Sequence, residues 1–153
     1  MEPRARRAAR LLVVDQDSGE VLLFQYEDAG RRWWATPGGG LEGDETFEQA
    51  AIREAGEELA LSCQPGAPIW RRTVEFPFKG ARIRQEEEFF LVRVARGELA
   101  LGRELRDAHR DEGIIATRWW TLADIDATSE QVFPEDLAHR LRELRADITQ
   151  PSP

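Results

Sequence analysis

Residues 38–61 contain the feature that most constrains the fold, a glycine-rich turn that leads directly into an acid-rich amphipathic helix. The segment reads GGGLEGDETFEQAAIREAGEELAL. Thr46 followed three residues later by Gln49 is the pattern of a capping box, which predicts that a helix begins just after Thr46. The apolar side chains of this helix gather on one arc: Ala51, Ile52, Ala55 and Leu59. We therefore expect this flank to pack on a β-sheet.

A second arc of the same helix carries three carboxylates. At 3.6 residues per turn, Glu54, Glu57 and Glu58 fall within roughly 100° of one another. Like charges at this spacing destabilise a helix, so a positive group is expected between them. An all-oxygen set suits a hard cation such as Mg²⁺, with Mn²⁺ as the alternative. The pattern therefore predicts a metal site beside the glycine turn.

The spacing of these residues resembles the motif of the Nudix hydrolases. That motif is Gly, five residues, Glu, seven residues, Arg-Glu, an aliphatic residue, any residue, Glu-Glu, any residue, Gly and an aliphatic residue. The matching positions are Gly39, Glu45, Arg53, Glu54, Ala55, Glu57, Glu58 and Leu61. Ala60 stands where the family usually has glycine, and we expect it to displace or loosen the helix end, because alanine is unfavourable in a left-handed C-cap.

The resemblance implies roles for the residues of the motif. The metal ligands would be Glu54, Glu57 and Glu58, with the carbonyl of Gly38 completing the coordination. Arg53 would orient the glutamates, and we place it in the catalytic group for that reason. The resemblance gives Gly39 and Glu45 structural or supporting roles around these ligands.

The hydrolysis that the resemblance implies begins with attack by a water molecule, and a base is needed to take a proton from that water. The resemblance supplies it either from the motif helix or from a glutamate in a later loop. Glu57 is the first candidate and Glu112, just before an expected strand, is the second. Asp111 and Glu104 are weaker rivals in the same polar connection.

Residues for substrate recognition are less constrained by the sequence. Arg31 and Arg32 could meet phosphate or a nucleoside, or simply occupy a solvated turn. Aromatic side chains could stack a base or belong to the core: Trp33, Trp34, Tyr26, Phe24 and Phe78. From these we select Arg31, Arg32, Trp34 and Phe78 as substrate candidates. In the acidic, strand-like run 86–88, one or two side chains are expected to face solvent.

The remaining elements suggest one α/β (α+β) domain over residues 1–153, with flexible ends at 1–7 and 147–153. Strands are expected at 8–15, 20–27, 33–36, 70–78, 81–94 and 113–120, and helices at 122–125 and 134–145. This order fits a sandwich of helices around a mixed sheet. The resemblance implies the same α/β/α architecture. We also expect residues 89–92 to form the face of a homodimer.

Charge and composition limit the partners. The net charge is −8, so binding of nucleic acid through the general field of the protein is not expected. A single cysteine, Cys63, excludes an internal disulfide and favours a reducing compartment, which predicts a cytoplasmic protein. No apolar run approaches the ~20 residues of a membrane span. The basic residues 1–10 precede an apolar run too short for a signal peptide.

The motif residues favour a Mg²⁺-dependent hydrolase that cuts a phosphoanhydride in a nucleoside di- or triphosphate, or in a related nucleoside diphosphate linked to another group. An ADP-ribose or nucleotide-sugar pyrophosphatase stays open, because Pro77 lies 16 residues after Leu61, near an offset found in such members of the family. A nucleotide-binding module without catalysis is a different class, but the full set of glutamates argues against it. Isomerase chemistry on a prenyl diphosphate would need an activated cysteine, a pattern that Cys63 does not supply.

Overall fold

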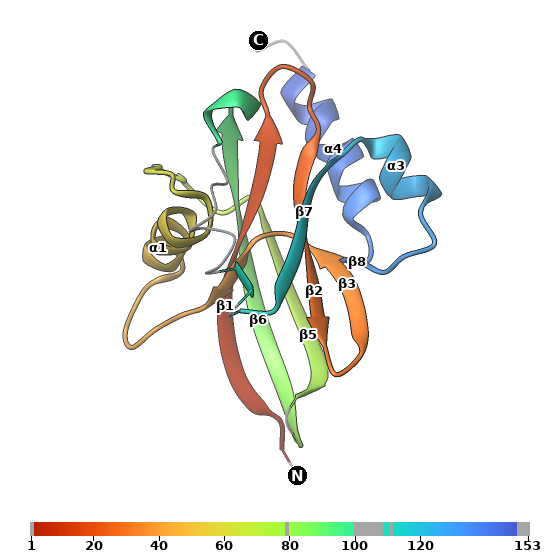
Figure 1. Ribbon diagram of the computed structural model, residues 1–153. Helices are drawn as coiled ribbons and strands as arrows, with labels where there is room; N and C mark the ends of the chain where they lie inside the picture. The colour runs from red at the N-terminus through yellow and green to blue at the C-terminus, as the bar shows by residue number, and fades with distance from the viewer. Residues whose placement is uncertain (1, 79, 100–108, 111, 150–153) are drawn as a thin grey trace.

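Helices cover both faces of a mixed, curled β-sheet in the computed structural model of the chain (Figure 1). The structure describes residues 2–78, 80–99, 109–110 and 112–149. Within these residues, eight strands form one sheet, in which β5, β6, β1, β2, β3 and β8 are successive neighbours, β4 pairs with β1, and β7 pairs with β2. The expected α/β sandwich is confirmed.

The strands are β1 (Arg4–Asp15), β2 (Val21–Asp28), β3 (Arg31–Ala35), β4 (Gly38–Gly40), β5 (Trp70–Phe78), β6 (Ala81–Val94), β7 (Ile114–Trp120) and β8 (Val132–Phe133). The centre of the sheet is the parallel pair β1 and β6, which stay in register from Arg4 opposite Ile83 to Asp15 opposite Val94. β5 lies at the edge of the sheet, so Pro77 interrupts no central ladder.

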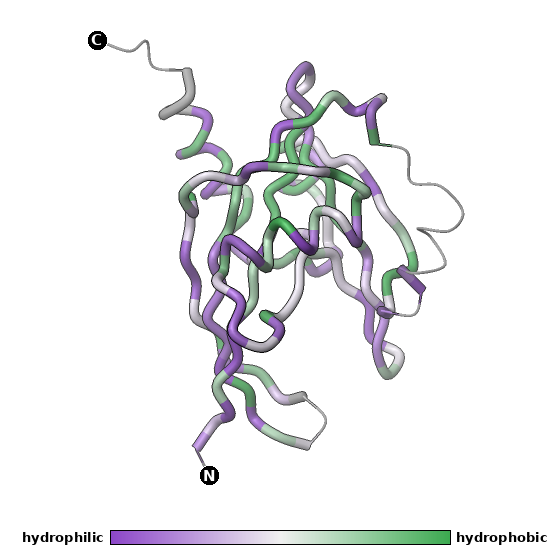
Figure 2. Tube along the Cα trace, turned by 90° about the vertical axis from the view of Figure 1, so that its left-hand side faces the viewer, coloured by the Kyte–Doolittle hydropathy of each residue, from purple (hydrophilic) through white to green (hydrophobic). Residues whose placement is uncertain are grey.

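The helices are α1 (Phe47–Leu59), the short 3₁₀ turn η1 (Arg96–Glu98), α3 (Leu122–Ala127) and α4 (Leu137–Thr149). α1 packs on one face of the sheet, where the helix residues Ala51, Ala55 and Leu59 join a buried cluster with Phe24 and Phe90. α3 and α4 cover the other face, where the buried residues are Leu12, Val21, Leu23, Trp34, Trp120, Leu137 and Leu141. Figure 2 shows that hydrophobic segments gather in the interior of the fold.

Both ends of the chain are more regular than expected. β1 begins at Arg4 rather than Ala8, because its first residues pair with β6 in the parallel ladder. Residues 4–7 are therefore part of the sheet rather than of a loose arm. α4 begins at Leu137 rather than Pro134 and extends to Thr149. Residues 150–153 lie outside the described part of the chain.

Both ends of α1 are capped. Thr46 accepts a hydrogen bond from the backbone N–H of Gln49, whose side chain accepts one from the N–H of Thr46, as the capping box predicted. At the other end Ala60 itself adopts the left-handed conformation, with φ 54°. Its N–H bonds to the carbonyl of Gly56, which is the bond of a simple left-handed cap, and the N–H of Leu61 bonds to the carbonyl of Ala55. The expectation of a displaced helix end was wrong, because these two bonds hold alanine in the cap.

Replacing Ala60 with glycine is expected to raise the free energy of unfolding by about 1 kcal/mol. A Cβ in the left-handed region clashes with the backbone, and glycine removes that penalty without changing the two capping bonds. Chemical denaturation of both proteins measures the difference. A matched Gly→Ala change at the open position Gly43, also at positive φ, should lower stability. Equal stability of Ala60→Gly and wild type would contradict a strained cap.

Residues 89–92 were expected to form a dimer face. This expectation was wrong, because these residues do not form an exposed surface. Phe89 and Phe90 are each 1% exposed, and Val92 is also buried. Because strand side chains alternate, Phe90 and Val92 pack towards α1 while Leu91 packs on the opposite cluster. These apolar residues belong to the core of the protein itself.

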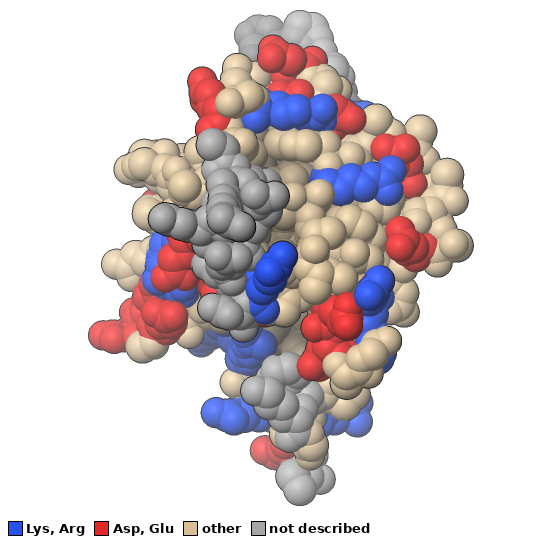
Figure 3. Space-filling view, in the orientation of Figure 1, with Lys and Arg blue, Asp and Glu red and all other residues tan. Residues whose placement is uncertain are grey.

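Two surface properties follow from the described residues. No helix among them is long and apolar enough to cross a membrane. Acidic and basic side chains are interspersed on the face shown in Figure 3.

Candidate functional site

Glu54 and Glu58 are buried carboxylates one turn apart on α1. They are 6% and 2% exposed, respectively. Acidic side chains are seldom buried without partners, since removing a charge from water is unfavourable. The Oε2 atom of Glu58 has no hydrogen-bond partner among the described residues. The folded chain therefore holds an unsatisfied acidic oxygen next to a second carboxyl.

Burial raises the pKa of Glu58, and the neighbouring carboxyls of Glu112 and Glu54 raise it further. Burial also raises the pKa of Glu54, although contacts with Glu58 and Arg53 oppose the shift. In both cases the charged form is disfavoured by a dry environment and by a like charge nearby. A bound cation would reverse both effects.

The glycine turn allows the backbone to approach these carboxylates. A Cβ on Gly39 would lie 2.6 Å from Oε1 of Glu54, so glycine lets that carboxylate rest against the main chain. Gly38 has a φ of 138°, and a Cβ there would lie 2.1 Å from the carbonyl oxygen of Ala9 in β1. The carbonyl of Gly38 accepts a long hydrogen bond of 3.4 Å from Nη1 of Arg10.

Arg53 is the organising side chain of the site. Its Nε and Nη2 bind the two oxygens of Glu45 at 2.8 and 2.9 Å, and Nη2 also donates to the carbonyl of Gly40 at 3.0 Å. Nη1 donates to Glu54 at 3.1 Å and to Glu57 at 3.2 Å. A guanidinium has five N–H donors, and these five bonds occupy them. Arg53 therefore orients the glutamates and has no donor left for a substrate.

Glu45 is held in place from two sides. The fork of Arg53 lowers the pKa of Glu45, and the backbone N–H of Glu42 donates to the same carboxylate at 2.8 Å. Glu45 thus holds Arg53 in place and does not point into the acidic pair. This position is that of a supporting residue rather than of a metal ligand.

Glu57 differs from its two neighbours. Its side chain is 51% exposed and is bound to Arg53 on the outer side of the helix. Among the described residues, no three Asp, Glu, His or Cys side chains are gathered closely enough to form a complete metal site. Glu54 and Glu58 are the pair whose burial and unsatisfied oxygen fit a hard cation, and Glu57 would have to release Arg53 to join them.

Glu112 lies against the acidic pair, and the buried Tyr26 lies in its neighbourhood. The carboxyl of Glu112, from the turn before β7, lies close enough to that of Glu58 for a hydrogen bond when one of them is protonated. The hydroxyl of Tyr26 is buried without a hydrogen-bond partner among the described residues. Burial raises the pKa of Tyr26, and its charged neighbours are Arg10, Glu58, Glu54 and Glu112. Asp111 and Glu104, the rival bases, lie outside the described residues.

Three of the four substrate candidates lie away from this pair. Trp34 is 6% exposed, packs edge-on against Trp120 and donates to Glu130 at 3.2 Å, so its rings belong to the core. Arg32 pairs with Glu27 across the exposed β2–β3 hairpin, next to Arg31. Figure 1 shows this hairpin well away from α1. Phe78 ends β5, and its side chain lies outside the described part of the structure.

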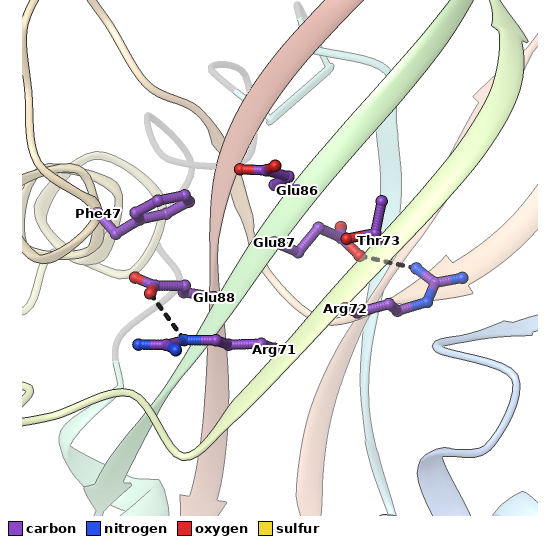
Figure 4. A pocket seen from close by; sticks show the side chains of 7 residues that line it. All are labelled: Phe47, Arg71, Arg72, Thr73, Glu86, Glu87 and Glu88. Atoms are coloured by element: carbon purple, nitrogen blue, oxygen red, sulfur yellow. Dashed lines mark hydrogen bonds and ion pairs between the residues drawn. The ribbon is translucent and has the colours of Figure 1, made fainter.

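The acidic run 86–88 is split between the two faces of β6 (Figure 4). Glu86 and Glu88 point towards Phe47 and line a cavity of about 250 Å³ beside the start of α1. Glu87 also contributes to the lining, but its side chain points the other way and is 4% exposed. It binds Arg10 at 2.9 Å and Arg72 at 2.7 Å. Glu86 is exposed, as expected for one or two residues of the run, whereas two arginines allow Glu87 to be buried.

Comparison with known proteins decides the family. The family model described as the NUDIX domain matches residues 5–144. The chain belongs to the NUDIX domain family. Its motif residues are those that form the capped helix, the Arg53 network and the buried pair described above.

Two curated relatives and one solved structure illustrate the likeness. The chain is 34% identical over 95 residues to MutT4 of Mycobacterium tuberculosis, covering 58% of this chain and 38% of that protein. It is 43% identical over 47 residues to phosphatase NudJ of Escherichia coli, covering 31% of each. It thus spans about a third of the length of these relatives. A MutT protein from Methanosarcina mazei has a TM-score of 0.70 at 19% identity, covering 98% of this chain and 99% of that one, which shows the fold alone.

Replacing Arg53 with lysine is expected to lower activity by roughly 10- to 100-fold, the usual effect of losing a group that orients metal ligands. Lysine keeps the charge but cannot form the fork to Glu45 while also reaching Glu54 and Glu57. Steady-state kinetics with Mg²⁺ measure the change, and Arg32→Lys on the exposed hairpin is the control. Full activity in Arg53→Lys would contradict an orienting role.

Sequence reasoning missed three residues near the site. His109 is buried in the polar connection, a segment without a periodic hydrophobic pattern. Tyr26 was considered as a stacking platform or a core residue, but not for its hydroxyl, which is buried without a hydrogen-bond partner among the described residues. Arg10 was read only as part of a basic N-terminus, but it reaches Glu87 and the carbonyl of Gly38. Strand alternation could have placed Arg10 and Glu87 on the same face, since β1 and β6 are both long strands.

Proposed function

We propose that this chain is a Mg²⁺-dependent hydrolase that cuts a phosphoanhydride bond in a nucleoside di- or triphosphate, or in a nucleoside diphosphate linked to another group. The observation that carries the proposal is the buried pair Glu54 and Glu58 in the motif of the family: Glu58 has an unsatisfied oxygen, and Glu54 is held by Arg53. Mn²⁺ would be an alternative metal.

The residues present fit such an ion, since they supply carboxylate oxygens in a dry setting. Glu54 and Glu58 would hold it, with Glu57 and the carbonyl of Gly38 as further ligands. A divalent cation at this position would neutralise diphosphate oxygens and lower the pKa of a bound water. Arg53 and Glu45 would keep the carboxylates oriented, which limits the rearrangement needed for reaction.

The reaction consumes one water. The water oxygen forms a bond to phosphorus, the bond from phosphorus to the bridging oxygen breaks, and a proton passes from the water to a carboxylate. We place Glu112 ahead of Glu57 as that base. Glu112 faces Glu58 from another element, whereas Glu57 is held by Arg53 on the outside of α1.

A substrate panel tests the proposal. Nucleoside triphosphates, ADP-ribose and a nucleotide sugar are incubated with Mg²⁺ or with EDTA, and released phosphate, pyrophosphate and nucleoside monophosphate are measured. We expect hydrolysis of at least one class that EDTA abolishes. Equal activity in EDTA would contradict a metal-dependent reaction, and tight nucleotide binding without turnover would instead identify a binding module.

The proposed partner is a small phosphorylated molecule rather than a nucleic acid. The net charge of −8 disfavours binding to a polyanion through the general field of the protein. The free thiol of Cys63 is consistent with a reducing compartment, and we propose the cytoplasm. With residues 89 and 90 in the core, a homodimer would need another face.

A further inference from the structure

His109 joins the turn before β7 to the end of α1. Its ring is 3% exposed and lies against Phe24, with centroids 4.9 Å apart. Its Nε2 atom lies 2.8 Å from the backbone carbonyl oxygen of Glu58. A carbonyl only accepts hydrogen bonds, so Nε2 carries a hydrogen and donates it. The last carbonyls of a helix lack partners within the helix, and His109 supplies one to the residue that holds the buried carboxyl.

The same histidine holds the turn that carries Glu112. The backbone N–H of Glu112 donates to the carbonyl of His109 at 3.1 Å. The next residue, Gly113, is held by backbone bonds on both sides. Its N–H donates to the carbonyl of Arg110 at 3.0 Å, and its carbonyl accepts a hydrogen bond from the N–H of Glu27 in β2 at 2.9 Å. Glu112 is therefore held between one anchor on α1 and another on the sheet. The anchor on α1 is made by the side chain of His109, whereas the anchor on the sheet is a bond between two backbone groups.

We propose that His109 is a positioning residue, which fastens this turn to α1 so that the carboxylate of Glu112 stays opposite Glu58. The inference rests on the proposed function, because it assigns Glu112 as the base. Its physical basis is that a small misplacement of a reacting group can lower a rate about a hundredfold. His109 touches neither water nor substrate in this role, so it acts only through Glu112.

Two substitutions separate the hydrogen bond from the packing. His109→Phe keeps a ring against Phe24 but removes the donor. His109→Gln loses the ring but places an amide N–H near the position of Nε2. We expect His109→Phe to lower kcat roughly tenfold to a hundredfold with little change in KM, and His109→Gln to recover most of the loss. Wild-type kcat in His109→Phe would overturn the proposal, as would an equal loss in both variants.

A double-mutant cycle tests whether His109 acts through Glu112. In a Glu112→Gln background, His109→Phe should cause no further loss, because the group it positions is already gone. Additive losses would show that His109 acts independently of Glu112, which would overturn the proposal.

Amide hydrogen exchange in metal-free protein gives a readout that does not depend on turnover. The N–H groups of Glu112 and Gly113 should exchange faster in His109→Phe than in wild type or His109→Gln. Unchanged exchange would overturn the anchoring.

If wild type hydrolyses nothing in the panel, the proposed function fails while exchange still tests the anchor. Should His109→Phe not fold, His109→Asn, whose shorter amide falls short of the Glu58 carbonyl, replaces it in each comparison.

Discussion

Replacing Glu58 with glutamine should lower kcat by about a thousandfold while the fold stays intact. A metal supplies several kcal/mol of charge stabilisation in such reactions, and each 1.36 kcal/mol is about tenfold in rate. Glutamine has nearly the same shape but lacks the charge that attracts the ion. Glu58 is also the carboxyl whose Oε2 has no partner among the described residues, so it has the most to gain from an ion.

Stability in EDTA separates this effect from unfolding. The buried environment disfavours a charged Glu58, so the neutral variant should unfold at the same temperature as metal-free wild type or at a higher one. Mg²⁺ or Mn²⁺ should raise the unfolding temperature of wild type but not of the variant. Glu48→Gln, on the exposed first turn of the same helix, is the matched control and should behave as wild type. Unimpaired turnover in Glu58→Gln would contradict the assignment.

Replacing Glu87 with glutamine should lower the free energy of unfolding by about 3 kcal/mol. Removing one partner of a buried ion pair leaves a buried charge without compensation, which is strongly destabilising. Here two guanidinium groups lose their counter-charge, since Arg10 and Arg72 both bind Glu87. Gln85, which also donates to Glu87 at 3.0 Å, would have to rearrange.

The neighbouring residue offers a matched control. Glu88 pairs with Arg71, whose side chain is 77% exposed, and exposed pairs contribute about 0–1 kcal/mol. Glu88→Gln should therefore change stability by less than about 1 kcal/mol, as measured by denaturation in urea. If the two variants lose equal stability, Glu87 is not the buried centre of a charge network.

The same network predicts a pH dependence. Burial alone would raise the pKa of Glu87, but Arg10 and Arg72 together lower it below the ordinary value of 4.5. A carboxyl whose pKa is lower in the folded state stabilises the fold above its unfolded pKa, and this stabilisation is lost as the pH falls through the folded value. The stability gap between wild type and Glu87→Gln should thus be full at neutral pH and shrink below about pH 4.5.

The motif helix is where sequence and structure agree most closely. Thr46 and Gln49 cap it as predicted, and Ala51, Ala55 and Leu59 of the apolar arc pack on the sheet, whereas Ile52 is exposed. This agreement is physical, because capping and helical periodicity are local properties of the chain. The contacts of Arg53 with Glu54 and Glu57 are local in the same way, because these residues are near it in sequence.

The errors came from contacts between distant segments. Trp34 became core because α4 and Trp120 cover its face of the sheet, and no local pattern shows which face is covered. The burial of Glu87 was not foreseen, because its partners, Arg10 and Arg72, meet it only through the pairing of β1 and β5 with β6. His109 sits in a segment without periodicity, so its contact with Glu58 required the folded chain.

The central claim is that the buried carboxyls of Glu54 and Glu58 bind one divalent cation. Soaking crystals of the protein in Mn²⁺ and recording anomalous scattering at the manganese edge measures this directly. The expected result is a single strong peak within coordination distance of oxygens from both carboxylates, lost in Glu58→Gln. A map with no peak there, and with the two side chains separated in solvent, would contradict it.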